Sequence, residues 1–211
     1  MNVESLLESA EPSLLVIEER SRKDIVVGVP HHAPAGTSTL PCPEHQVSDE
    51  NAGFLGHYLA EKLDCCSIIA CNYTIDVNKS LQSDYAVQIA SWKPAVLVEI
   101  HGHGKEKARH DIEISSGSGV NSDCSETLAE RLESVLSTSD GFKTISICGE
   151  RDRLYYKASK AVTVSDERWV TYHIELPPEL RKQPGDSMDV PRAGYEFCDA
   201  LAKVLTEMYR S

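Results

Sequence analysis

The chain has 211 residues, of which 41% are hydrophobic and 26% are charged, and its formal net charge is −12 at pH 7. This composition is typical of an ordinary soluble globule, and the length predicts one domain over residues 1–211. The excess of acids argues against a nucleic-acid partner or an anionic membrane surface, because phosphates require a basic surface, but it permits a small anionic substrate in a local cationic pocket.

The elements expected from the sequence alternate between strands and helices. Short runs rich in β-branched residues predict strands over 13–20 and 24–30, and a Pro-rich loop over 31–46 precedes a helix over 48–63 that Ser48 or Asp49 caps. Further strands are expected over 66–73, 94–102, 111–115, 143–149 and 168–177, and further helices within 79–92 and over 125–136 and 192–210. The alternation predicts an α/β fold with a mostly parallel or mixed sheet.

Polar residues end several of these expected strands. His31 and His101 end two of them, the segment 76–79 follows a third, and Glu175 lies near the end of a fourth. In α/β sheets ligands gather at the carboxyl ends of the strands. We therefore expect these residues to meet at one edge of the sheet.

Neither a membrane span nor a disulfide framework is indicated. No stretch approaches the ~20 apolar residues that a span needs, and the N-terminus carries acids where a signal peptide would carry lysines. The seven cysteines are odd in number and include no CxxC pair, which also argues against a thiolate zinc site. Reduced thiols and a cytoplasmic location are the expectation.

Two pairs of histidines follow apolar strands. His31 and His32 stand in "VPHHAP", and His101 and His103 stand in "EIHGHG". A lone histidine at a strand end is most often a packing or capping residue, but two pairs at two strand ends favour a metal site. Imidazole is a common zinc ligand, and a catalytic zinc site takes three protein ligands, two histidines and a carboxylate being one standard set.

Acids, an amide and a lysine complete the candidate site. Asp49 or Glu50, in "SDENAG", could supply the carboxylate ligand, although acids in a first helical turn also complement the helix dipole. Asn78 and Lys79, in "YTIDVNKS", suit a substrate carboxylate, where the alternative is an ordinary turn. Glu175 lies in an apolar strand before two prolines, so it is either a surface residue of an edge strand or a base beside an activated water.

These motifs occur in one order along the chain: "PHHA", "SDENA", "DVNK", "EIHG" and "IELPPELR". Over about residues 25–180 this order resembles the N-formylglutamate amidohydrolase family. The resemblance implies a three-layer α/β/α sandwich with a mixed, mostly parallel central sheet, similar to the zinc carboxypeptidases. It also implies one zinc ion and hydrolysis of an amide C–N bond. The chain contains no GxSxG, Walker, GxGxxG or HExxH motif that would favour another mechanism.

Carried onto this sequence, the resemblance makes His31 and His101 metal ligands. It makes Asp49 or Glu50 the third ligand and Glu175 the general base. The expected substrate is a small acidic N-acyl amino acid or peptide. The alternatives are a carboxypeptidase-like or γ-glutamyl-peptide hydrolase on the same scaffold, a metal-binding protein without turnover, and a partner-binding module.

The same resemblance makes Asn78 and Lys79 the clamp for the substrate carboxylate. Lys79 stands where the family has arginine and so loses the bidentate fork, while His32 replaces a serine and His103 adds an imidazole. His101 sits directly at the strand end, whereas His103 lies beyond a glycine in chain that is unlikely to continue the strand. We therefore expect His101 to be the ligand and His103 to contact the substrate or support the site.

Three arginines, Arg151, Arg153 and Arg181, are secondary candidates for charge stabilisation. Each is otherwise expected as a solvated surface residue.

Overall fold

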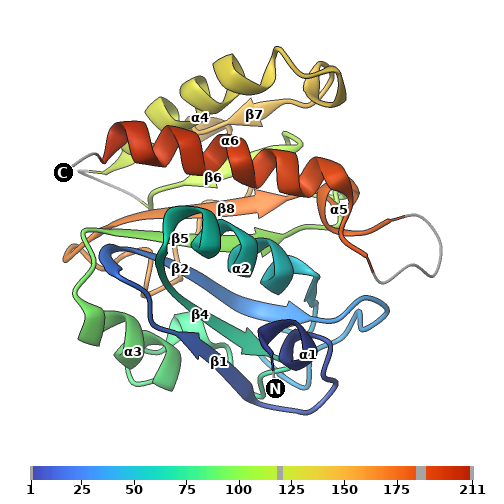
Figure 1. Ribbon diagram of the computed structural model, residues 1–211, viewed down its shortest axis with the longest axis vertical. Coiled ribbons are helices and arrows are strands. Elements are labelled where there is room, and N and C mark those ends of the chain that lie inside the picture. The colour runs from blue at the N-terminus through green and yellow to red at the C-terminus, as the bar shows by residue number, and fades with distance from the viewer. Residues whose placement is uncertain (1, 118–120, 184–188, 210–211) are drawn as a thin grey trace.

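The computed structural model describes residues 2–117, 121–183 and 189–209, which form an eight-stranded sheet with helices on both faces (Figure 1). The strand order is β1-β4-β2-β5-β8-β6-β7, and β3 pairs with β2 outside this path. The strands are β1 (Leu14–Glu18), β2 (Arg22–Ala33), β3 (Asp49–Glu50), β4 (Cys65–Cys71), β5 (Val96–Gly102), β6 (Ile112–Ser115), β7 (Ile147–Cys148) and β8 (Val170–Leu176).

The sheet is mixed and mostly parallel, as expected. Strands β4, β2, β5 and β8 are parallel neighbours, whereas β1 runs antiparallel to β4 and β6 runs antiparallel to β8. The four central strands therefore bring their carboxyl ends to the same edge. Their interior residues are almost all buried, as is typical of parallel strands covered on both faces.

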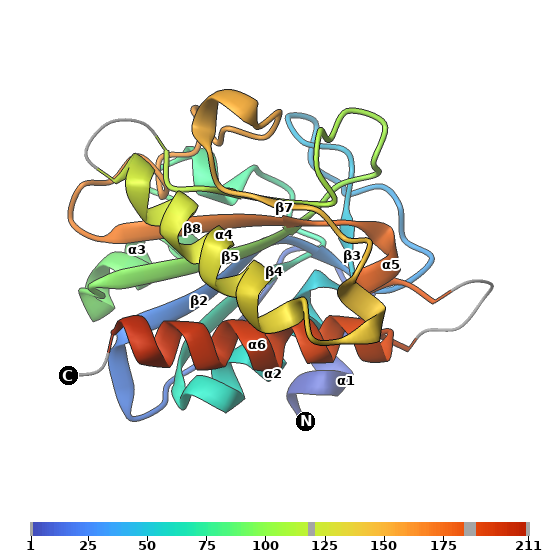
Figure 2. The same cartoon turned by 90° about the horizontal axis from the view of Figure 1, so that it is seen from above.

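Helices cover the two faces unequally. Figure 2 shows α1, α2 and α6 along one face and α3 on the other, and the core residues of α4 belong to the same apolar cluster as those of α2 and α6. The helices are α1 (Val3–Leu7), α2 (Ala52–Leu63), α3 (Asp84–Trp92), α4 (Ser122–Leu136), α5 (Pro178–Arg181) and α6 (Arg192–Met208), with short 3₁₀ turns η1 (Val77–Lys79), η2 (Asp140–Phe142) and η3 (Arg151–Arg153). The α/β/α architecture is confirmed.

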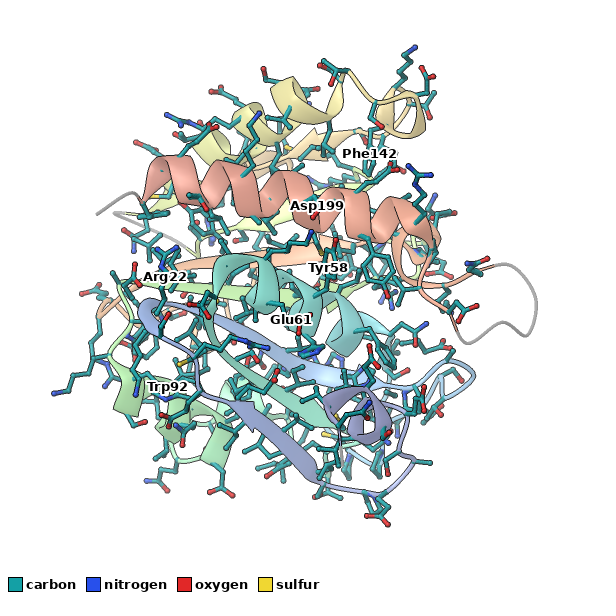
Figure 3. The ribbon with its side chains drawn as sticks, in the orientation of Figure 1. Arg22, Tyr58, Glu61, Trp92, Phe142 and Asp199 are labelled. Carbon is teal, nitrogen blue, oxygen red and sulfur yellow. The ribbon has the colours of Figure 1, made fainter. Side chains whose placement is uncertain are left out.

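Two separate apolar cores lie on the two faces of the sheet. On the α6 face, Phe197, Leu201 and Leu205 are fully buried at intervals of four residues, which places them along one stripe of the helix. Tyr58 of α2 donates a hydrogen bond to Asp199 of α6 at 3.1 Å, and both are labelled in Figure 3. Within the described part of the chain, no helix is both long enough and apolar enough to cross a bilayer.

The start of α2 differs from the expectation. Asp49 and Glu50 do not open this helix, which begins at Ala52. They form β3, because His32 and Ala33 pair with them in parallel and hold the backbone extended. Asn51 then turns the chain into the helix with a positive φ of 63°. The acids are thus held by the sheet rather than by a helix terminus.

The strand that carries the first histidine pair is also longer than expected. β2 continues to Ala33, so His31 and His32 lie in the strand and not in the loop after it. Most other boundaries differ from the expected ones by a few residues, the largest difference being the expected strand over 143–149, of which only β7 forms.

Candidate metal centre

The polar residues of β5 and β8 share one face of the sheet. His101 pairs with Glu175, and Glu99 pairs with His173, on these adjacent parallel strands. The residues between them, such as Ile100, point into the core beneath α2 and α6. Because side chains alternate between the two faces of a strand, all four polar side chains project to the side of α3.

A shift in strand pairing decides which histidine of β2 joins them. Val27 and Val29 point into the core beneath α2, and strict alternation would send His31 there as well. The register with β4 shifts between Val29 and His32, and such irregularities re-aim side chains. His32 therefore takes the core side, where its Nε2 lies 3.0 Å from the carbonyl of Leu7, and His31 takes the side of the polar cluster.

His31, Asp49 and His101 form the group that we call the histidine–aspartate cluster. Asp49 Oδ2 lies 3.6 Å from His31 Nδ1 and 3.3 Å from His101 Nδ1, and all three side chains are buried. Among the described residues, neither His31 Nδ1 nor Asp49 Oδ2 has a hydrogen-bond partner. Buried polar atoms are rarely left this way, so two imidazole nitrogens and a carboxylate oxygen that converge here fit a zinc ion.

A carboxylate behind His31 fixes the orientation of its ring. Asp76 Oδ1 lies 3.0 Å from His31 Nε2, so this nitrogen carries a proton, and Nδ1 is the nitrogen that has a lone pair when the ring is neutral. Lys79 forms an ion pair with the other oxygen of Asp76. His45, from the loop before β3, stacks on His31 with ring centroids 3.8 Å apart.

The charges in the cluster are strongly coupled. Burial lowers the pKa of His101, but contacts with Asp49 and Glu99 outweigh it and raise that pKa to about 10. Burial also opposes the charged form of His31, and its contacts with Asp49 and Asp76 still raise its pKa. The pKa of Asp49 is held well below its usual range, because contacts with the two histidines outweigh burial. The bare cluster thus favours a carboxylate between imidazolium rings.

Glu175 has the opposite electrostatic character. Burial raises its pKa to about 7, against the attraction of His101. His173 Nε2 lies 3.6 Å from Glu175 Oε1, and burial lowers the pKa of His173 well below its usual value, so this imidazole is neutral. Glu175 is therefore a carboxyl group that can gain or lose a proton near neutral pH.

Glu50 lies outside the cluster, although the sequence offered it as an alternative to Asp49. Its Oε2 accepts a hydrogen bond from the backbone of Gly36 at 2.8 Å, and its Oε1 forms an ion pair with Lys182 at 2.8 Å. Successive residues of β3 point in opposite directions. Only Asp49 therefore faces the two histidines.

Asn78 and Lys79 occupy η1, beside the cluster. Lys79 has a side chain that is 40% exposed, and its ammonium group contacts Asp76. Asn78 is buried, its carbonyl accepts a hydrogen bond from Val162, and within the described chain its Oδ1 has no hydrogen-bond partner. Lys79 is thus linked to His31 through Asp76, and Asn78 precedes Lys79 in the same turn.

His103 has both ring nitrogens engaged in its own loop. Its Nε2 lies 2.9 Å from the carbonyl of Asp111, and its Nδ1 accepts a hydrogen bond from the backbone of Lys105 at 3.1 Å. Its ring stacks against Tyr156, with centroids 5.6 Å apart. This arrangement leaves His103 without a nitrogen lone pair for a metal ion.

Arg181 is buried, and the expectation of a surface position is wrong for it: only 3% of the residue is exposed. Its guanidinium donates hydrogen bonds to the carbonyls of Leu176, Glu50 and His103. A Cβ atom on Gly102 would lie 2.1 Å from the central carbon of this guanidinium, so glycine is required there. Arg181 holds the end of β8, β3 and the segment after β5 together.

Arg151 and Arg153 lie in η3, and both contact residues outside the histidine–aspartate cluster. Arg151 Nη1 donates a hydrogen bond to the carbonyl of Gly117 at 2.5 Å, and Arg153, which is exposed, pairs with Glu150 at 3.2 Å.

Several residues near the cluster escaped the sequence argument. The sequence predicts Asp76 only as part of a turn, although an acid after a buried strand can also orient a neighbouring metal ligand. Glu99 is the residue that the sequence marks most clearly, because it is a charged residue inside an apolar run. In the structure it is fully buried. His45 and His173 offer no such signal, since one lies in a loop and the other in an apolar strand.

No protein-family model matches this sequence, and no curated protein matches it either. Solved structures do match its fold. A bacteriophage poly-γ-glutamate hydrolase aligns over 98% of this chain and 94% of its own, with 13% identity and a TM-score of 0.58. N-formylglutamate amidohydrolase from Ralstonia eutropha JMP134 aligns over 92% of this chain and 96% of its own, with 10% identity and a TM-score of 0.57.

A third structure, described as YNDL in a zinc-free apo form, aligns over 98% of this chain and 96% of its own, with 12% identity and a TM-score of 0.50. At these identities the likeness shows a shared fold. The resemblance expected from the ordered motifs is thus confirmed at the level of the fold.

Proposed function

We propose that this protein is a zinc-dependent hydrolase of amide bonds, with His31, Asp49 and His101 as the metal ligands. One observation carries the proposal: a buried carboxylate oxygen lies within 3.6 Å of two imidazole nitrogens, at the edge of the sheet where ligands bind in α/β folds. The shared fold with two structures named as hydrolases of amide-linked glutamate compounds supports the same class of reaction.

The donor set fits zinc in kind and in number. Two imidazole nitrogens and one carboxylate oxygen are a standard set for a catalytic site, which leaves one position open. Zinc in such a site polarises a carbonyl group and lowers the pKa of water to roughly 7. Asp76 supports the set, since it accepts a hydrogen bond from the Nε2–H group of His31 and so leaves Nδ1 as the nitrogen that can bind the metal.

Glu175 acts as the general base in this proposal. It takes a proton from the attacking water and passes it to the leaving nitrogen of the amide. Its place opposite His101 in the sheet puts it beside the proposed ligand, and its raised pKa, about 7, suits both halves of this proton transfer.

The substrate that we propose is a small acidic N-acyl amino acid or peptide. Lys79 is the partly exposed cation beside the cluster, and its ammonium group has three donors, of which Asp76 requires only some. The buried Oδ1 of Asn78, which has no hydrogen-bond partner among the described residues, offers an acceptor in the same turn. Together they would hold the carboxylate and an N–H group of the substrate.

Metal analysis combined with hydrolysis assays tests this proposal. The purified protein is loaded with zinc and assayed against N-formylglutamate, N-acetylglutamate and γ-glutamyl oligomers. We expect one bound zinc ion and turnover of at least one of these substrates. Glu175→Gln should keep the zinc and lose about 10²–10⁴ of the rate, whereas Glu179→Gln, an exposed control nearby, should keep both.

Two outcomes contradict the proposal in different ways. Tight zinc binding without turnover of any of these substrates would favour a metal-binding protein. Zinc binding that survives in the His31→Ala, His101→Ala double variant would place the ion elsewhere.

A further inference from the structure

A buried carboxylate lies behind His101, on the side away from Asp49. Glu99 is 0% exposed, and its Oε2 lies 3.6 Å from His101 Nε2. Among the residues that the structure describes, His101 is its sole ion-pair partner within 4.0 Å. Neither Glu99 Oε2 nor His101 Nε2 has a hydrogen-bond partner there, and their separation of 3.6 Å is that of an ion pair rather than a hydrogen bond. The two atoms therefore face each other.

Tyr85 holds the other oxygen of this carboxylate. Its hydroxyl group donates a hydrogen bond to Glu99 Oε1 at 3.0 Å, and its side chain is fully buried in the core between α3 and the sheet. A tyrosine hydroxyl in such a core needs a partner, and this carboxylate provides it. The bond leaves Glu99 Oε2 directed at His101.

A glycine in the neighbouring strand makes room for this contact. Gly28 of β2 pairs with Glu99 of β5, and a Cβ atom at position 28 would lie 2.1 Å from the hydroxyl oxygen of Tyr85. That oxygen cannot move away without losing Glu99. Three elements, β2, α3 and β5, thus contribute one residue each to the contact.

A buried carboxylate needs a physical reason. Removing it from water is costly unless it is paired, and an apolar side chain would fill the same space more cheaply. A histidine that binds a metal through one ring nitrogen usually donates a hydrogen bond from the other ring nitrogen to a carboxylate, a backbone carbonyl or a water molecule. Asp76 stands in this relation to His31, at 3.0 Å, and Glu99 is the carboxylate in the corresponding place behind His101, at 3.6 Å.

We propose that Glu99 is a positioning residue for His101 and that Tyr85, admitted by Gly28, holds Glu99 in place. This inference rests on the proposed function, because it concerns the zinc ligand. In zinc-loaded protein, where His101 is neutral, Glu99 would accept a hydrogen bond from the Nε2–H group of His101. Nδ1, which lies 3.3 Å from Asp49, would then be the nitrogen with a lone pair for the metal. Neither residue touches the substrate.

Zinc affinity is the readout, measured by competition with a chromophoric chelator and without any assay of activity. Glu99→Gln should weaken zinc binding about 10- to 100-fold. Tyr85→Phe should weaken it less, since it frees Glu99 without removing it. The control is Tyr172→Phe: Tyr172 is equally buried and its hydroxyl group is also hydrogen-bonded, to Tyr209 at 2.7 Å, but it lies on the opposite face of the sheet.

A second pair of variants, made in His101→Ala protein, separates a positioning role of Glu99 from a general loss of stability. In His101→Ala protein, Glu99→Gln should have no further effect on zinc affinity, because the residue through which it acts is gone. The tautomer of His101 gives a measurement that requires no variant at Glu99. In zinc-loaded wild-type protein, imidazole ¹⁵N shifts should show a proton on Nε2 and the metal on Nδ1.

The outcomes distinguish this inference from the function on which it rests. If wild-type protein binds no zinc, both are overturned. If wild-type protein binds zinc tightly but Glu99→Gln and Tyr85→Phe match wild type, only the positioning role is overturned. A proton on Nδ1 of His101 in the loaded protein would overturn it as well.

Discussion

His101 and Glu175 occupy paired positions on the adjacent parallel strands β5 and β8. Because one register places both residues, the proposed metal ligand and the proposed base cannot drift apart without a slip of the strands. A slip by one residue would turn Glu175 into the core beneath α6 and bring Ile174 to the site. The relative position of His101 and Glu175 therefore depends on the apolar residues of β5 and β8 that set this register.

Zinc binding should release protons. The pKa of His101 is raised to about 10 and that of His31 is raised as well, whereas a ligand imidazole must have a free nitrogen. Ligand-competent His101 is therefore lost as the pH falls through about 10. We expect zinc affinity to rise with pH up to that value, with release of at least about one proton per ion at pH 8, from His101, and a further contribution from His31. Calorimetry in buffers of different ionisation enthalpy measures this number, and an identical heat in all buffers would contradict the prediction.

Glu175 should lower the stability of the metal-free fold at neutral pH. Its folded-state pKa of about 7 lies above the usual value of 4.5, so the folded protein holds a proton that the unfolded chain releases. The advantage of Glu175→Gln in free energy of unfolding should therefore grow between pH 4.5 and 7 and stay constant above, on the order of 3 kcal/mol. Urea unfolding of chelator-treated protein at several pH values measures it. If the difference in free energy of unfolding between Glu175→Gln and wild type were the same at pH 5 and pH 8, burial would not raise the pKa of this carboxyl group.

Glu175 should also set the acidic limb of the activity. The base form is required, and it disappears as the pH falls through the pKa of this carboxyl group, which burial raises and the neighbouring zinc ion would lower again. We expect kcat/KM to fall tenfold per pH unit on that side. The profile is measured with the best substrate of the panel, and Glu175→Gln should show a low rate without this limb. An unchanged limb in the variant would assign it to another group.

Lys79→Met should discriminate between substrates. Loss of a charge-assisted hydrogen bond costs about 1.5–3 kcal/mol, so KM for a substrate with a free carboxylate should rise roughly 10- to 100-fold. The same substrate with its carboxylate converted to an amide should respond little, which controls for any effect on Asp76 and His31. Equal losses for the two substrates would remove Lys79 from the carboxylate contact.

Gly102→Ala should destabilise the protein. Its Cβ would meet the guanidinium of Arg181, a buried group that bonds three carbonyls and cannot swing into solvent. We expect a loss of about 2–3 kcal/mol in the free energy of unfolding. Gly104→Ala is the matched control, because its Cβ would meet only the flexible end of Glu106. Chemical denaturation of the two variants compares them, and equal losses would show that Arg181 has room to move.

The sequence was sufficient for the fold class and for the residues at the strand ends. Apolar runs that end in His101 or lead to Glu175 report burial and direction, which are local properties. The choice between Asp49 and Glu50 was beyond it, since that choice depends on pairing with β2 in the folded chain. The burial of Arg181 was equally hidden, because the three carbonyls that it bonds come from separate segments.

The choice between His31 and His32 shows the same limit. Both stand at the end of the same apolar run, and simple alternation after Val29 would have placed His32 rather than His31 in the cluster. The pairing shift with β4 decides, and it depends on residues of another element. Such irregularities are readable only once the partner strand is in place.

That shift also means that two adjacent side chains work on opposite sides of one strand. His32 accepts a backbone hydrogen bond from Gly53 at the start of α2 and lies 3.0 Å from a carbonyl of α1, while His31 faces Asp49. The imidazole of His32 thus joins α1 to β2, the strand that carries the proposed ligand His31. Displacement of α1 would therefore remove the contact between Leu7 and His32, the residue next to the proposed metal ligand His31.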